Sequence, residues 1–140
     1  MRIPMVFVGP GIAANVVSAQ FAQLHDLMPT VAALLGIDPP ASSEGSALLG
    51  ANAAAFSRPT AYFQYYDLHR GIRTADRWKF IGYRLTVPGP QFDRVQLFDL
   101  NADPRELNDL SAVDAYQTKL SALQSLLASQ RARYDDPLVK

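Results

Sequence analysis

The order of apolar and polar residues divides the chain into two parts with different patterns. Residues 3–8 form a short, continuous apolar run that ends at Gly9-Pro10-Gly11. A run of this length is typical of a strand buried on both faces. Pro4 places it at a sheet edge or near the strand start, because proline lacks the N–H that a ladder needs. We therefore expect a core strand that begins almost at the first residue, as at an internal point of a longer protein.

A helix is predicted over residues 26–36. Asp26 suits the N-cap, since its carboxylate can accept hydrogen bonds from first-turn N–H groups. Pro29 would lie in the first turn, where its missing N–H costs nothing. Gly36 suits the left-handed position that ends a helix. The apolar residues recur at helical spacing and predict one stripe that faces a core: Leu27, Val31, Leu34 and Leu35.

After a turn-rich connection over residues 37–59, the pattern becomes that of an antiparallel sheet. Alternation of Trp78, Phe80 and Gly82 with their neighbours is typical of a strand with two distinct faces. Four strands are predicted, over residues 60–66, 71–74, 77–84 and 94–100. We place the boundary between the two parts at residues 58 and 59, which gives domains 1–58 and 59–140.

A long helix is predicted at the end of the chain, over about residues 115–133, with Asp114 as its cap. Its apolar residues make a single stripe suited to covering one face of the sheet: Tyr116, Leu120, Leu123 and Leu127. The fold class predicted for the whole chain is therefore α+β.

Composition excludes several function classes. Thirteen Lys and Arg residues balance thirteen Asp and Glu residues. No broad basic surface is implied, which argues against nucleic acid or an anionic membrane as a partner. No apolar run approaches the roughly 20 residues of a membrane span. The absence of cysteine excludes disulfides, zinc–thiolate sites and cysteine nucleophiles, and it leaves the compartment undecided.

Three motifs in order cover nearly the whole chain. The first is the Arg-Ile-Pro run with Gly-Pro-Gly at residues 2–12, and the second is Asp-Leu-Met-Pro-Thr at 26–30 with Glu-Gly-Ser-Ala-Leu-Leu at 44–49. The third is Gly-Ile-Arg-Thr-Ala-Asp-Arg-Trp-Lys-Phe-Ile at 71–81, with Leu-Phe-Asp-Leu at 97–100 and Asp-Pro-Arg-Glu-Leu-Asn-Asp-Leu at 103–110. Together they resemble the C-terminal portion of sulfatases of the alkaline phosphatase superfamily.

The resemblance implies a C-terminal piece of the α/β sulfatase core, a strand plus a helix, followed by a four-stranded antiparallel sheet packed by a long C-terminal helix. It also implies a parent sulfuric ester hydrolase that acts on sulfated carbohydrate or aryl sulfate, binds calcium and uses formylglycine. The Cys/Ser-x-Pro-x-Arg motif that yields formylglycine does not occur here. The family's calcium and sulfate ligands lie upstream of the resembling segment. We therefore expect no catalytic residue, metal site or cofactor in this chain. Family members are often periplasmic, secreted or lysosomal.

His69, Arg70 and Arg73 are the candidate substrate-binding residues. Arginine makes bidentate contacts with sulfate or carboxylate, and the C-terminal subdomain of related sulfatases borders the mouth of the active site. The competing interpretation of Arg73 is a strand residue paired with a carboxylate. Nearby aromatic residues can stack on a sugar ring or serve as core and rim: Tyr62, Phe63, Tyr65 and Tyr66.

Three other polar residues are predicted to be structural. His25 is expected to be a surface or capping residue, since no second histidine lies at metal-ligand spacing. Asp103 and Glu106 are better explained by an Asp-Pro turn and by pairing with a basic strand residue than by acid–base chemistry.

Several roles stay open at this point. The chain can be the non-catalytic C-terminal part of a sulfatase, a subunit that completes an active site with a catalytic-half chain, or a binding module for sulfated glycans. A phosphodiesterase or phosphonate hydrolase branch of the superfamily is a further alternative, because the nucleophile that separates the branches is missing. Residues 3–35 would expose apolar surface in isolation, so we also expect self-association or loose packing there.

Overall fold

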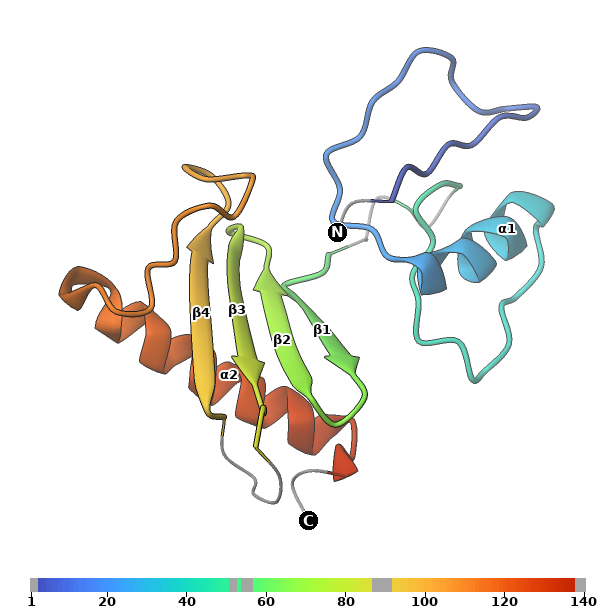
Figure 1. Ribbon diagram of the computed structural model, residues 1–140. Helices are drawn as coiled ribbons and strands as arrows, with labels where there is room; N and C mark the ends of the chain where they lie inside the picture. Colours follow the sequence, from blue (N-terminus) through green and yellow to red (C-terminus); the bar gives the residue numbers. More distant parts are fainter. Residues whose placement is uncertain (1–2, 51–52, 54–56, 87–91, 138–140) are drawn as a thin grey trace. The chain divides into compact units, whose positions relative to one another are not determined.

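The computed structural model describes residues 3–50, 53, 57–86 and 92–137. Its elements belong to two compact units, Met1–Ala54 and Ala55–Lys140, which are described separately below. Figure 1 shows α1 in the first unit and the four strands with α2 in the second.

The first unit contains little regular structure. A short 3₁₀ turn, η1 (Leu24–Asp26), leads into α1 (Leu27–Leu35). The strand predicted for residues 3–8 is wrong, because these residues are irregular and Val8 is 91% exposed. A strand needs neighbours that pair its N–H and C=O groups, and the described part of this unit contains no other strand.

The ends of α1 match the prediction only in part. Gly36 ends the helix in the left-handed region, with φ 70° and ψ 28°, as predicted. Asp26 lies at the N-cap position, but its side chain makes no cap hydrogen bond to its own helix. The buried carboxylate accepts instead from the N–H groups of Gln23, at 2.7 Å, and Ser46, at 3.0 Å.

The buried face of α1 is not the predicted one. Its buried residues are Pro29, Thr30 and Ala32. The Thr30 hydroxyl donates to the Asp26 carbonyl at 2.6 Å and accepts from the Leu48 N–H at 2.9 Å, so the loop after the helix covers this side. The predicted apolar stripe is exposed by 41% or more at each position: Leu27, Val31, Leu34 and Leu35.

The second unit is built on a four-stranded antiparallel sheet in the order β1-β2-β3-β4. Its strands are β1 (Thr60–Tyr65), β2 (His69–Thr74), β3 (Trp78–Tyr83) and β4 (Arg94–Asp99). The predicted sheet is confirmed, with one difference of consequence: β2 begins at His69 and not at Gly71. Its register places Tyr62, Ile72, Phe80 and Leu97 opposite one another across the strands.

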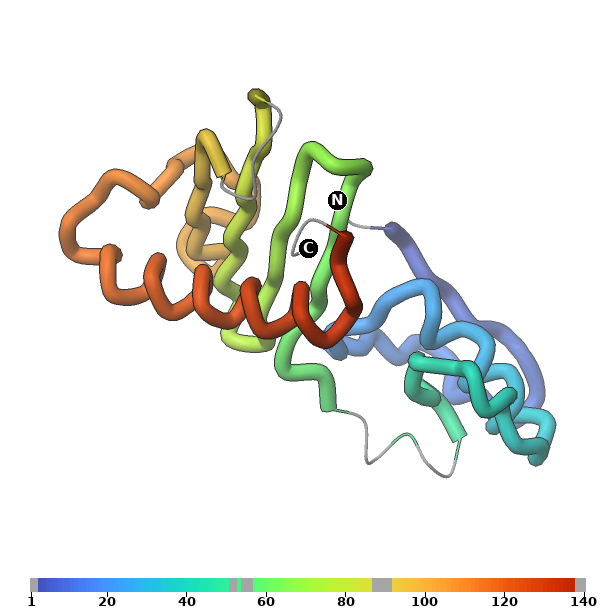
Figure 2. The backbone as a smooth tube through the Cα atoms, turned by 90° about the horizontal axis from the view of Figure 1, so that it is seen from below, coloured from blue at the N-terminus to red at the C-terminus, as the bar shows by residue number. Residues whose placement is uncertain are grey.

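The helix α2 (Gln117–Arg133) covers one face of this sheet, as Figure 2 shows. The core consists of three sheet residues and three helix residues: Ile72, Phe80, Leu97, Leu120, Leu123 and Leu127. Tyr116 packs against this cluster, so the predicted stripe is confirmed.

The cap predicted for this helix is wrong. Asp114 is the first residue of a 3₁₀ turn, η3 (Asp114–Tyr116), and its side chain caps neither that turn nor α2. The Gln117 side-chain amide donates instead to the carbonyls of Ser111 and Val113. These bonds fix the chain where it enters α2.

Candidate functional site

The three residues predicted to bind substrate lie on two different faces of the sheet. Successive side chains of a strand point to opposite faces, and β2 begins at His69. Arg70 therefore shares the face of Ile72, which α2 covers, whereas His69 and Arg73 point to the other face. We call the latter the outer face.

Arg70 is 1% exposed, and its guanidinium is bonded through all three nitrogens. Nε donates to Asp136 Oδ2 at 2.7 Å and Nη2 donates to Oδ1 at 2.9 Å. Nη1 donates to the carbonyl oxygens of Tyr66, at 2.6 Å, and His69, at 2.9 Å. The hydrogen bond to Asp136 raises the pKa of Arg70 further above its usual value. This side chain supports the β1–β2 turn from inside the domain.

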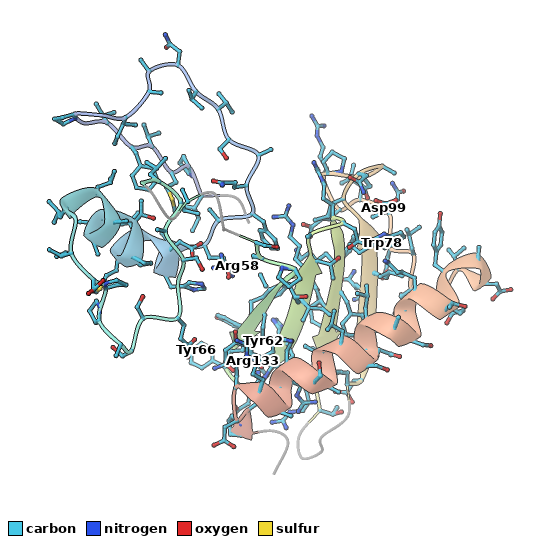
Figure 3. The ribbon with its side chains drawn as sticks, turned by 180° about the vertical axis from the view of Figure 1, so that it is seen from behind. Arg58, Tyr62, Tyr66, Trp78, Asp99 and Arg133 are labelled. Carbon is cyan, nitrogen blue, oxygen red and sulfur yellow. The ribbon has the colours of Figure 1, made fainter. Side chains whose placement is uncertain are left out.

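Asp136 is the centre of this buried network. Besides Arg70 it accepts from the Tyr62 hydroxyl at 3.1 Å and from Arg131 Nε at 2.9 Å. Burial, with the negative charge of Asp136 next, raises the pKa of Tyr62 to about 12. Figure 3 shows Tyr62 near the end of α2 that carries Arg133.

His69 lies in a row of four residues on the outer face. The register aligns Tyr65, His69, Tyr83 and Arg94 across β1, β2, β3 and β4, and we call them the His69 row. The His69 ring stacks on Tyr65, with centroids 5.6 Å apart, and meets Tyr83 edge to face at 4.7 Å. Arg94 Cζ lies 5.9 Å from the Tyr83 ring centroid.

The chemistry of the His69 row suits a sugar that carries a negative charge. Tyr65 is 56% exposed, and an exposed aromatic ring can pack on the apolar face of a pyranose. Arg94 is exposed, and its guanidinium has the planar donors that match a sulfate oxygen pair. These residues come from all four strands, so the sheet fixes their spacing.

Arg73 lies in the far row of the same face, aligned with Ala61, Lys79 and Phe98. Lys79 Nζ lies 2.5 Å from Glu106 Oε2, so Glu106 pairs with a basic strand residue as predicted. The Phe63 ring lies between the two rows, over Gly71.

The remaining polar candidates have structural environments. Asp103 Oδ2 accepts from the Asn108 N–H at 2.8 Å, which fits the predicted turn. His25 is half exposed, and its Nε2 lies 3.6 Å from Asp26 Oδ1. Both contacts are local along the chain.

The described residues do not fit the calcium or formylglycine that the resemblance implies. No group of three or more His, Cys, Asp or Glu side chains among them could hold a metal ion. Ser57-Arg58-Pro59-Thr60-Ala61 lacks the arginine of the formylglycine motif. No step of the chemistry is therefore assigned to this chain's residues. Within the residues that the structure describes, no helix has the length and apolar character to cross a membrane.

Sequence reasoning missed Tyr83, Arg94, Arg131 and Asp136. The alternation over residues 77–84 separates Tyr83 from the face of Trp78 and Phe80, and a β2 that starts at His69 pairs Tyr83 with His69. No local pattern marks Asp136, because its partner Arg70 lies 66 positions earlier in the chain.

Comparison with protein families gives a match over nearly the whole chain. The model described as N-sulphoglucosamine sulphohydrolase, C-terminal, matches residues 1–133. The chain is 28% identical to N-acetylglucosamine-6-O-sulfatase from Bacteroides thetaiotaomicron over an alignment of 149 residues, which covers 96% of the chain and 26% of that protein. It is 31% identical to arylsulfatase K from Rattus norvegicus, over 79% of the chain and 21% of that protein.

Solved structures agree with these matches. One is a protein in complex with its substrate D-glucosamine-2-N,6-O-disulfate, with 30% identity and a TM-score of 0.63 over 79% of this chain and 24% of that one. Another is a 2-O GAG sulfatase, with 27% identity and a TM-score of 0.60 over 79% of this chain and 25% of that one. The chain spans about a quarter of the length of these relatives.

Proposed function

The chain belongs to the sulfatase family, as a sulfatase C-terminal domain, and on this premise we propose that it acts as the C-terminal part of a sulfuric ester hydrolase for sulfated carbohydrates. The observation that carries the proposal is the family match over residues 1–133. The sugar sulfatase from Bacteroides thetaiotaomicron, which aligns with 96% of the chain, favours a carbohydrate over a simple aryl sulfate. Calcium binding and the formylglycine nucleophile belong, in this proposal, to the catalytic part of the enzyme.

The role of this chain in that enzyme is substrate contact and structural support. We propose that the His69 row holds a sugar ring on Tyr65 and a sulfate or carboxylate near His69 and Arg94. The support for this is the alignment of the four residues, the ring contacts of His69 at 4.7 and 5.6 Å, and the exposure of Tyr65 and Arg94. Arg73, on the same outer face, is a second candidate contact, whereas Arg70 acts as a support.

The apolar stripe of α1 is proposed as the surface that packs against the catalytic part. Leu27, Val31, Leu34 and Leu35 are exposed in this chain, and an apolar patch of this kind marks a protein contact. About three quarters of the length of the Bacteroides thetaiotaomicron relative lies outside the match, and we propose that the corresponding catalytic part supplies the surface that covers the stripe. In the absence of that partner, the same stripe would mediate self-association.

A chimeric enzyme tests the proposed function. The matching C-terminal quarter of the Bacteroides thetaiotaomicron sulfatase is replaced by this chain, and sulfate release from N-acetylglucosamine 6-sulfate is measured. We expect turnover by the chimera, and none by the isolated chain with the sugar sulfate or an aryl sulfate. A second arm supplies the chain in trans to the truncated sulfatase, which detects assembly from two chains.

Two variants of the chimera examine the His69 row. His69→Ala and Arg94→Ala should raise KM for the sulfated sugar about tenfold and change kcat less, because they remove ground-state contacts and no reacting group. A folded chimera that releases no sulfate from N-acetylglucosamine 6-sulfate would contradict the proposed function, and an unchanged KM in both variants would contradict the role of the His69 row.

A further inference from the structure

The chain beyond α2 folds back onto the sheet and places Asp136 in its interior. Asp135 adopts a left-handed conformation, with φ 49°, and the Asp136 N–H donates to the Arg131 carbonyl at 3.0 Å. Tyr134 stacks on Tyr62 of β1, with centroids 5.4 Å apart and an interplanar angle of 14°. This end of the chain is thus fastened to β1 and β2, and the Asp136 side chain is fully buried.

A buried carboxylate is stable only when its lone pairs are well bonded and its charge is compensated. Asp136 meets this condition through Arg70, Arg131 and Tyr62, with donor distances of 2.7 to 3.1 Å. Because one carboxylate bonds two guanidinium groups, its removal leaves the buried Arg70 and the partly buried Arg131 without their shared counter-charge. The orientation of Arg70 therefore depends on Asp136.

Arg70 carries this restraint to the turn between β1 and β2. Its Nη1 bonds the carbonyls of Tyr66 and His69, which lie on either side of that turn. Tyr66 has φ 44°, a conformation that costs free energy for a residue with a bulky side chain. The hydrogen bond from Arg70 to the Tyr66 carbonyl stabilises this conformation. Tyr65 and His69, paired in the register at the ends of β1 and β2, flank the turn.

We propose that Asp136, acting through Arg70, is a positioning residue that sets the geometry of the His69 row on the opposite face of the sheet. A series of hydrogen bonds links Asp136 on the α2 side of the sheet to Arg70 and, through Arg70 Nη1, to the backbone carbonyl of His69, whose side chain points to the outer face. Asp136 itself contacts no ligand. The ligand of the row, a sulfated sugar, rests on the proposed function; the mechanical coupling of Asp136 to the turn does not.

The test uses the full chain and separates this role from general stabilisation. Asp136→Asn is compared with Leu123→Ala, which removes core packing on α2 without touching the network. Amide hydrogen exchange is followed at Leu68, which donates to the Tyr65 carbonyl across the turn at 3.2 Å. Affinity for D-glucosamine-2-N,6-O-disulfate is measured by NMR titration at a temperature where every variant is folded, with unsulfated glucosamine as the reference.

We expect Asp136→Asn to speed exchange at Leu68 and to weaken binding of the disulfated sugar, each by about tenfold, because local opening and loss of preorganisation act on both. Leu123→Ala should change both by about twofold or less while lowering global stability. Arg70→Lys is the second variant, since lysine keeps a cation beside Asp136 but cannot also bond the two carbonyls. It should reproduce the effect of Asp136→Asn and decides the matter if the asparagine variant does not fold.

Three results carry distinct meanings. Unchanged exchange at Leu68 in Asp136→Asn overturns the positioning role, and Arg70→Lys takes its place if Asp136→Asn does not fold. The role is also overturned if Leu123→Ala changes exchange and binding as much as Asp136→Asn does. If exchange at Leu68 is faster in Asp136→Asn but His69→Ala still binds the disulfated sugar fully, the coupling is supported. The same result contradicts the proposed contact between the His69 row and the sugar. The exchange measurement keeps its meaning even if the chain binds no sulfated sugar.

Discussion

Gly71 shows how single residues shape the outer face of the sheet. A Cβ atom at this position would lie 2.3 Å from a Phe63 ring carbon and 2.9 Å from the Phe80 carbonyl oxygen. The Phe63 ring can therefore lie over Gly71 only because residue 71 has no side chain. Lys79 Nζ lies 5.9 Å from the centroid of the same ring, so the glycine also governs the contacts of its neighbours.

Gly71→Ala is expected to destabilise the chain by about 1–3 kcal/mol, because the methyl group displaces Phe63 and strains the backbone against β3. Urea-induced unfolding measures the change. In the Phe63→Ala background the cost of the glycine substitution should shrink, since only the Phe80 carbonyl then remains in the way. An equal cost in both backgrounds would show that the ring is not the obstacle.

Asp93 gives the chain an acid-sensitive contact. Its carboxylate accepts from the N–H groups of Leu85 and Thr86 and from the Thr86 hydroxyl. These bonds, the Thr86 hydroxyl first, lower the pKa of Asp93 below its usual value. A carboxyl group with a depressed folded-state pKa stabilises the fold above the unfolded-state pKa, and this contribution is lost as the pH falls through the folded-state value.

Asp93→Asn should therefore lower Tm at pH 6 and have a smaller effect at pH 3, where more of the wild-type carboxyl is protonated. Thermal melts at the two pH values measure the difference between wild type and variant. Asp114→Asn, which removes the same charge at another exposed position, controls for net charge. A Tm difference that stays constant between pH 6 and pH 3 would contradict the assignment.

The sequence predicts which residue types form the site better than it predicts the face of the sheet to which each side chain points. If β2 starts at Gly71, as the sequence predicts, His69 and Arg70 lie together in the preceding loop. The strand begins two residues earlier, so strict alternation separates them by the thickness of the sheet. An arginine at the start of a strand is expected at the surface. Arg70 is buried because Asp136, 66 positions later in the chain, neutralises its charge.

At the scale of elements, α1 and α2 show when a periodic apolar pattern is sufficient to predict which face of a helix is buried. The α2 stripe finds its partner within the same unit, because the sheet offers Ile72, Phe80 and Leu97 to it. The α1 stripe was predicted by the same rule but is exposed. A periodic pattern predicts that a face will be covered, but it does not identify the segment that covers it.

A matched pair of leucine substitutions tests this contrast. Leu127 is 1% exposed in the α2 core and Leu34 is 41% exposed on α1. Leu127→Ala should cost about 2–5 kcal/mol through lost burial and a residual cavity, whereas Leu34→Ala should change stability by less than about 1 kcal/mol, helped by the helix propensity of alanine. Chemical denaturation with separate probes for the two units measures both. The measurement is made at a concentration where the chain is monomeric, and equal costs there would mean that the α1 stripe is packed within the monomer.

At the scale of the whole molecule, the two units differ in how completely each covers its own apolar residues. The second unit contains a sheet, a covering helix and a core that closes on itself. The described part of the first unit has one α-helix with its apolar stripe exposed and an irregular apolar run at residues 3–8. This difference suits a domain whose first unit completes its core on other chain segments.

The exposed stripe should make the isolated chain associate with itself. We expect the sedimentation coefficient of the wild type to rise with concentration, and Val31→Lys with Leu34→Glu to abolish the rise, because the charges cannot be buried without partners. Leu107→Glu, at a 75% exposed position of the second unit, should leave association unchanged. Addition of the truncated catalytic part of the sulfatase should compete with association, since we assign both contacts to the same stripe. A wild-type monomer with sharp, dispersed amide signals over residues 3–35 would contradict this assignment and show that the first unit folds without a partner.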